Sequence, residues 1–284
     1  MLNVLKQARA AFSMLNPSEV HKRIRRPITF GLVAANDREF SDMERFLLPS
    51  SLPTPDRDDL RAEIYRAGAR GVPETVDVVL YQNGVPGPKG TYMFHRDDPE
   101  RTVREIVADN EELALGLARR YPGFRKFVVE RTIHSVAREN AFFSIASAIP
   151  DILPNLLELP WAVGEFASDI TFLTANQVRM AFLIAAASGK DVGFAEQKAE
   201  IAGIAAAAFG WRAIARELVG KIPFGGGLIP KGAIAYAATY ATGKGVERLH
   251  EGAPFTRAES EEAYRAAFQN GKNVARQIAE GSTS

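Results

Sequence analysis

Two of the histidines stand next to acidic residues in patterns that resemble metal sites. His250 and Glu251 begin the HExxH zinc motif, but position 254 is proline, so the second histidine ligand is missing. Behind His95 the chain carries three acids that could ligate a cation or cap a helix: Asp97, Asp98 and Glu100. Capping is the better interpretation, because helix starts recruit acids without any metal. We therefore predict that the chain holds no metal ion.

A phosphate-binding loop would appear as GxxxxGK[ST], which supplies a nest of backbone amides and a lysine, and the chain lacks this pattern. The segment that would take its place, residues 35–42, reads ANDREFSD and holds neither glycine nor lysine. Its acids would repel phosphate. Residues 225–230 fail the GxGxxG pattern at its last glycine, and no clear strand precedes them. We predict no nucleotide hydrolysis and no cofactor.

Nucleophilic chemistry has no sequence signature either. The chain contains no cysteine, which excludes disulfides, zinc–thiolate sites and cysteine nucleophiles. It has no GxSxG nucleophile elbow and no recognisable pair of catalytic carboxylates. We therefore assign no catalytic residue and predict that the protein is not an enzyme. An active site assembled from scattered residues is an alternative that no sequence pattern excludes.

The composition is that of a folded globular protein with almost balanced charge. The 284 residues, 46% apolar and 24% charged, suffice for one large or two small domains. The 35 basic and 34 acidic residues give a net charge of +1, which argues against nucleic acid as a partner. Lys6 and Arg9 interrupt the first apolar run, so we predict no signal peptide, and no window resembles a membrane span. A cytoplasmic location is the expectation.

The first 26 residues form the most strongly charged segment of the chain. This segment holds six basic residues and one acidic residue, Glu19. Its apolar residues lie near helical spacing, which predicts two short helices. This basic helical segment, 1–26, either docks on the main body with a solvated polar face or binds anionic lipid or an acidic partner. The interaction candidates within it are Lys22, Arg23, Arg25 and Arg26.

Residues 27–120 alternate between strand and helix patterns. Strands are predicted over 28–35, 75–81 and 91–95, and helices over 39–48, 55–69 and from Asp98 towards Arg120. Such alternation favours a small parallel sheet. We therefore expect a small α/β region that resembles a degenerate P-loop unit.

Residues 121–284 are predicted to form a bundle of five or six helices, so the expected fold class is α+β and mostly α. Residues 141–243 hold few charges, which fits a buried helical core or, less simply, a surface that dips into a membrane. Thr256 and Glu259 form a capping-box pattern before the last helix. Small residues at every fourth position predict close helix contacts: Gly203, Ala207, Ala233, Ala237 and Ala241.

Several polar residues of this helical region need partners. Asn176 and Gln177 lie in an apolar stretch beside Arg179, and a buried amide without a hydrogen bond costs about 1 to 3 kcal/mol. We predict that these amides act as structural clamps between helices. Arg212 and Arg216 lie one turn apart, where they would form ion pairs with nearby acids or present a basic patch to phosphate. These five residues are the further interaction candidates.

Four blocks between Phe124 and Gly245 occur in a characteristic order. They are 173–180 (LTANQVRM), 209–219 with FGWRA and ARELV, Pro223 with its glycine turn, and 231–243, which begins KGAIAY. Together they resemble a bacterial family of domains of unknown function that occurs alone or fused behind Era-like GTPase domains. The resemblance implies an α-helical module that works beside a GTPase, and some members of that family are membrane-associated. It implies no catalytic residue.

The sequence therefore predicts a non-enzymatic accessory or interaction protein. The expected partners are a GTPase and, as a second expectation, an anionic membrane surface, with a location in the cytoplasm or at the inner face of the membrane. The alternative is a degenerate P-loop-like protein that retains nucleotide binding without hydrolysis. The oligomeric state does not follow from the sequence.

Overall fold

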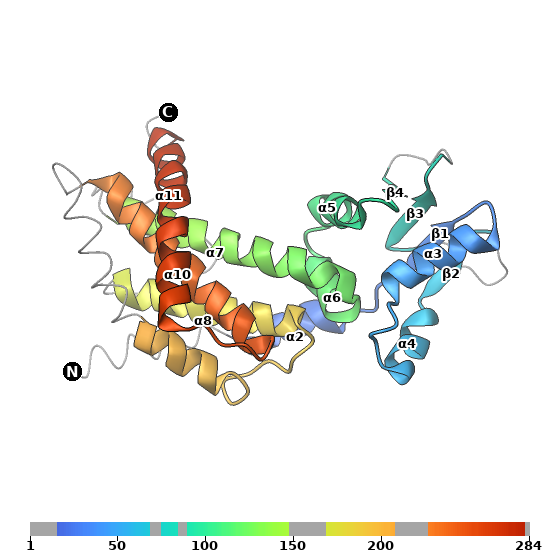
Figure 1. The fold of residues 1–284 in the computed structure, drawn as a ribbon, viewed down its shortest axis with the longest axis horizontal. Coiled ribbons are helices and arrows are strands. Elements are labelled where there is room, and N and C mark those ends of the chain that lie inside the picture. Colours follow the sequence, from blue (N-terminus) through green and yellow to red (C-terminus); the bar gives the residue numbers. More distant parts are fainter. Residues whose placement is uncertain (1–15, 69–74, 85–89, 148–168, 208–226, 282–284) are drawn as a thin grey trace. The chain divides into compact units, whose positions relative to one another are not determined.

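Two compact units make up the structure, a computed structural model that describes residues 16–68, 75–84, 90–147, 169–207 and 227–281. The sheet unit comprises Glu19–Glu130 and Ala186–Lys190. The helical unit comprises the described residues within 16–18, 131–185 and 191–281. The described residues are mostly helical, and a small parallel sheet precedes the long helices in the chain (Figure 1), which confirms the predicted fold class.

A four-stranded sheet in the order β2-β1-β3-β4 forms the centre of the sheet unit, and every neighbouring pair is parallel. Phe30 in the first strand lies opposite both Ile64 and Val78. Phe30 and Leu32 are fully buried, as expected for apolar residues of a strand flanked on both sides. The strand bounds are β1 Phe30–Val33, β2 Ile64–Arg66, β3 Val78–Gln82 and β4 Tyr92–Phe94.

Three of these strands confirm predictions, and the fourth corrects one. The predicted strands over 28–35, 75–81 and 91–95 correspond to β1, β3 and β4. The helix predicted over 55–69 is wrong in its second half, because α4, Thr54–Arg61, ends before β2. All three residues of β2 are half-buried, so neither alternation nor an apolar run marks this edge strand in the sequence. Its pairing with β1 decides its conformation.

Polar side chains cap two helices of the sheet unit. Its other helical elements are α2 Pro17–Arg25, α3 Asp37–Leu47, α5 Pro99–Asp109, α6 Ala114–Arg120 and the 3₁₀ turn η1 Pro122–Phe124. The amide of Glu39 donates to Oδ1 of Asn36 at 3.0 Å before α3. The amide of Arg101 donates to Oδ1 of Asp98 at 3.0 Å before α5, which confirms the predicted cap.

The helix predicted to run from Asp98 towards Arg120 is interrupted at Asn110. The side-chain Nδ2 of Asn110 donates to the carbonyl of Ile106 at 2.8 Å and to the hydroxyl of Tyr92 at 2.7 Å. A side chain that competes for the last carbonyls of a helix ends that helix. The predicted single helix is therefore the two helices α5 and α6.

Tyr121 lies at the centre of the aromatic core of the sheet unit. It is fully buried, and its ring lies edge-to-face on Phe30, with 4.9 Å between centroids, and 6.4 Å from Phe124. Its hydroxyl donates to the carbonyl of Ile28 at 3.1 Å. Burial raises the pKa of Tyr121, because the phenolate would lose its water. The core thus combines apolar contact with a satisfied polar group.

A short segment distant in sequence completes the sheet unit. Residues 186–190 follow the body of α8, Asp169–Ala187, and belong to this unit. Nη1 of Arg119 donates to the carbonyl of Lys190 at 2.6 Å. At Gly189 the backbone has a φ of +77°, which favours glycine. The turn at the end of α8 is therefore fixed against α6.

The described part of the helical unit consists mainly of long helices (Figure 1). They are α7 Arg125–Ala146, whose first turns belong to the sheet unit, α8, α10 Leu228–His250 and α11 Arg257–Gly281, and residues 198–207 are also helical. The predicted close contacts are confirmed at Ala233, Ala237 and Ala241, which are buried against α7 and α11. Gly203 differs: it is exposed, with no described atom within 4 Å of a built Cβ.

The predicted capping box before α11 is confirmed. The amide of Glu259 donates to Oγ1 of Thr256 at 3.3 Å, and the amide of Thr256 donates to Oε2 of Glu259 at 2.8 Å. The hydrogen bond from the Thr256 backbone lowers the pKa of Glu259, because it favours the carboxylate. The box therefore fixes the start of α11.

Gly271 marks a close approach of α11 to α10. A Cβ built on Gly271 would stand 2.8 Å from the carbonyl oxygen of Ala233 and 3.1 Å from its Cα. Because backbone atoms cannot rotate away, we expect Gly271→Ala to lower the free energy of unfolding by about 2 kcal/mol. Gly203→Ala is the control, because in that open helical position alanine raises stability by about 1 kcal/mol. Thermal unfolding of both variants checks this, and a neutral Gly271→Ala contradicts it.

Candidate functional site

The carboxyl edge of the sheet is where an α/β unit of this strand order would bind a ligand. The connection after β1 leads to the edge strand β2, and the connection after β3 leads to the opposite edge strand β4. The point between β1 and β3 is therefore a topological switch point. The backbone amide of Ala35, just after β1, donates to Oε1 of Gln82, the last residue of β3, at 2.8 Å. An internal hydrogen bond therefore bridges the two strand ends at this point.

The start of α3, at the same edge, carries acids paired with arginines. Asp37 forms an ion pair with Arg66 at the end of β2. Arg96, just after β4, pairs with Glu39 at 2.8 Å and with Asp42. A phosphate would need the free backbone amides and the positive potential of a helix start, where this chain places carboxylates. The described residues of this edge thus offer internal ion pairs and no phosphate cradle.

The helix α2 turns its apolar residues inward and its basic residues outward. Val20 and Ile24 are buried within the sheet unit, which confirms an amphipathic helix in the second half of segment 1–26. Residues 1–15 lie outside the described residues. The basic face, as we call the exposed basic side chains of this helix and its end, consists of Lys22, Arg23, Arg25 and Arg26.

Half of the basic face is already used in ion pairs. Lys22 pairs with Glu19 one turn earlier at 2.6 Å. Arg26 pairs with Asp77, which precedes β3 and also accepts from the amide of Thr29 at 2.9 Å. The other two residues form no ion pair with any residue that the structure describes: Arg23 and Arg25. These two guanidinium groups are available for an external anion.

A network of buried polar side chains joins α7, α8 and α10 in the helical unit. Asn140 donates from Nδ2 to Oγ1 of Thr239 at 2.7 Å and accepts from Nδ2 of Asn176 at 2.8 Å. Gln177 donates from Nε2 to the same Thr239 oxygen at 3.3 Å. All four side chains are buried. The two amides predicted to need partners have them, and the network is a clamp between three helices.

Arg179 extends this network towards the solvent. Its Nε donates to Oδ1 of Asn176 at 2.8 Å, and its guanidinium forms an ion pair with Glu139. Nδ2 of Asn176 also donates to Oε2 of Glu139 at 3.2 Å. The side chains of Arg179 and Glu139 are 31% and 29% exposed, so water screens their attraction. Arg179 therefore orients Asn176, and the described contacts give these residues a structural role.

His95 contacts a neighbouring helix. Its Nε2 lies 3.3 Å from Oε2 of Glu105 in α5, and its backbone amide donates to Oγ1 of Thr102 at 2.9 Å. Burial raises the pKa of Glu105, but hydrogen bonds from Arg101 and His95 outweigh this effect and hold the pKa below its ordinary value. Across the described ranges, no three His, Asp or Glu residues are arranged to hold a metal ion.

Sequence reasoning found part of these arrangements. It singled out Asn176, Gln177 and the caps, but it missed Asn140, which follows two charged residues, and the hydrogen-bonding role of Thr239, which stands in an apolar helical run. Arg212 and Arg216 lie outside the described residues. Among the helices the structure describes, none is both long and apolar enough for a membrane crossing.

Comparison with known proteins found no similar family model, curated protein or solved structure. The resemblance of residues 124–245 to the GTPase-associated domains therefore stays a prediction.

Proposed function

We propose that the chain is a non-enzymatic accessory protein that acts beside a GTPase and binds an anionic membrane surface through the basic face of α2. One observation carries the proposal: Arg23 and Arg25 are exposed and form no ion pair with a described residue, on a helix whose apolar side is buried. Clusters of basic side chains on an amphipathic helix are typical of segments that lie on anionic surfaces.

Two further observations support a non-enzymatic role. At the carboxyl edge of the sheet, Gln82 and the two arginines bond to groups of the chain itself. In the helical unit, the buried amides bond to one another and to Thr239. At both places, the polar side chains named here already have partners among the described residues. The GTPase partner rests on the resemblance of residues 124–245, and the retained nucleotide site of the alternative has less support because of the acids at the start of α3.

Liposome flotation tests the membrane part of the proposal. Each basic residue close to an anionic bilayer contributes about 1 kcal/mol, so the loss of two of them weakens binding by roughly thirtyfold, and the two reversed charges add repulsion. We expect the wild-type chain to float with phosphatidylserine vesicles but not with neutral phosphatidylcholine vesicles, and Arg23→Glu/Arg25→Glu to stay at the bottom. At about 1 M salt, where charges are screened beyond roughly 3 Å, wild-type flotation disappears.

A charge-matched variant separates a local effect from a change in net charge. Arg38→Glu/Lys126→Glu makes the same change on two other exposed residues of the sheet unit and should float like the wild type. Point substitutions are preferable to deleting residues 1–26, because deletion would remove the buried Val20 and Ile24. Equal loss in both double variants, or flotation that survives 1 M salt, contradicts a contact through the basic face.

A further inference from the structure

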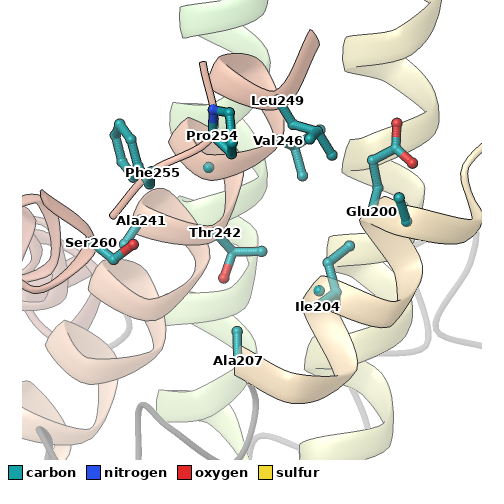
Figure 2. Close-up of a pocket in the computed structure, with 13 residues that line it drawn as sticks. Glu200, Ile204, Ala207, Ala241, Thr242, Val246, Leu249, Pro254, Phe255 and Ser260 are labelled. Atoms are coloured by element: carbon teal, nitrogen blue, oxygen red, sulfur yellow. The ribbon is translucent and has the colours of Figure 1, made fainter. Parts of the chain in front are cut away.

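A pocket of about 320 Å³ lies within the helical unit (Figure 2). One wall is the helical stretch 198–207, the other is the second half of α10, and residues 254–260 close one end. Figure 2 shows Ile204 and Ala207 on the first wall facing Thr242 and Val246 on the second. Its volume falls at the lower end of the range of small-molecule sites.

The walls of this pocket are smooth and mainly apolar. Gly203 and Gly245 stand on opposite walls, and no described atom lies within 4 Å of a Cβ built on either. The space that a side chain would fill at these positions is therefore open. Ile204 and Val246 are buried, whereas Leu249 is 36% exposed at the rim. A slot with small residues on both sides and branched apolar ones around it suits a narrow hydrocarbon chain.

Glu200 is the one ionisable residue among the described residues that line the pocket. It is only 8% exposed, and Oε1 lies 3.5 Å from Nε2 of His250. A carboxylate removed from water needs a cation or hydrogen-bond donors, and the imidazole of His250 forms an ion pair with Glu200 only when it is protonated. Arg248 lies over the Phe255 ring, 5.8 Å from its centroid, but does not line the pocket. The described lining of the pocket therefore carries one carboxylate and no basic side chain.

We propose that this pocket binds a small cationic amphiphile, with its hydrocarbon chain between Gly203 and Gly245 and its ammonium group against Glu200. The apolar part is held by burial of its surface, and the ammonium adds a charge-assisted hydrogen bond to a carboxylate inside a site with little water. A ligand of the same length with a carboxylate head would face repulsion from Glu200. Charge complementarity thus selects the class of ligand.

The test uses the full chain and three probes of equal chain length: octylamine, octanol and octanoate. Isothermal titration calorimetry at neutral pH should show saturable binding of octylamine and binding of octanoate at least about tenfold weaker. Glu200→Gln should remove most of the preference of octylamine over octanol, because the charge is lost while the shape is kept. Similar affinity of all three probes, or no binding of octylamine, overturns the proposal.

Substitutions that fill the pocket provide an independent test of the proposal. Gly203→Leu places a side chain into open space on a helix, where leucine is a better helix former than glycine, so the variant should fold. We expect it to weaken octylamine binding by at least about tenfold. Ala206→Leu, at an exposed position of the same stretch that does not line the pocket, should bind like the wild type. Unchanged binding in Gly203→Leu places the probe elsewhere and overturns the assignment. Gly245→Leu repeats the test from the opposite wall.

Discussion

Replacing Tyr121 by alanine should lower the free energy of unfolding of the sheet unit by about 4 kcal/mol. The side chain is fully buried, so its removal leaves a cavity beside Phe30 and deprives the carbonyl of Ile28 of its donor. A loss of this size is a large fraction of the total stability of a typical domain. Urea unfolding followed by hydrogen exchange in peptides from β1 and α6 measures the effect on this unit alone.

Tyr121→Phe is the matched variant, because it keeps the ring and removes only the hydroxyl. We expect it to lower stability by about 1 kcal/mol, the net contribution of one hydrogen bond. If Tyr121→Ala lowers the free energy of unfolding no more than Tyr121→Phe does, packing of the Tyr121 ring does not stabilise the sheet unit.

Tyr121 also makes the stability of the sheet unit fall at alkaline pH. Burial raises the pKa of Tyr121 above its ordinary value of 10.0, so the unfolded chain releases this proton first as the pH rises. The stability is therefore fully present below pH 10.0 and falls as the pH rises above it. Tyr121→Phe should reduce this fall in the sheet unit, where burial also raises the pKa of Tyr92, and should leave the fall in the helical unit unchanged, because burial raises the pKa of Tyr264 there.

Replacing Asn140 by leucine should lower the free energy of unfolding of the helical unit by about 3 kcal/mol. The substitution removes the hydrogen bonds of Asn140 with Thr239, Asn176 and the carbonyl of Leu173, and each such bond contributes about 0.5 to 1.5 kcal/mol net. Leucine has the same number of side-chain heavy atoms and the same branching at Cγ as asparagine, so most of the loss reports on hydrogen bonding. Hydrogen exchange in peptides from α8 and α10 measures it.

Asn273→Leu is the control for this prediction, because it makes the same exchange at an exposed position of α11 and should change stability by less than about 0.5 kcal/mol. A second variant, Thr239→Val, removes the shared oxygen from the other side. If the network acts as a unit, the double variant Asn140→Leu/Thr239→Val should lose clearly less stability than the sum of the losses in the two single variants. Strict additivity would mean that the two residues act separately.

The helix caps could be predicted from sequence because they depend on contacts within one turn of chain. The cap by Asp98 and the box of Thr256 and Glu259 are set by residues three positions apart, so their pattern is visible in the sequence. The bond between Asn140 and Thr239 joins residues 99 positions apart. No local pattern specifies such a pairing, and the same holds for β2, which takes its conformation from β1.

At the carboxyl edge of the sheet, too, local patterns could be predicted from the sequence and long-range contacts could not. The missing phosphate loop could be predicted, because it is a contiguous motif that the segment after β1 lacks. The groups that occupy the edge could not, because Gln82 and Arg96 come from other strands. Likewise, the spacing of Gly203 and Ala207 predicted contact between helices, whereas the two residues line a pocket. Spacing identifies a smooth helix face but not what lies against it.

The attachment of residues 186–190 to the sheet unit has a consequence for how the protein is made. During synthesis the ribosome releases β1 to α6 long before it releases the turn that bonds to Arg119. The first unit to emerge is therefore completed only after the whole of α7 and α8 has been translated. For the same reason, a gene fragment ending at codon 130 encodes an incomplete unit, and a contiguous cut in the reading frame does not separate the two halves of this protein.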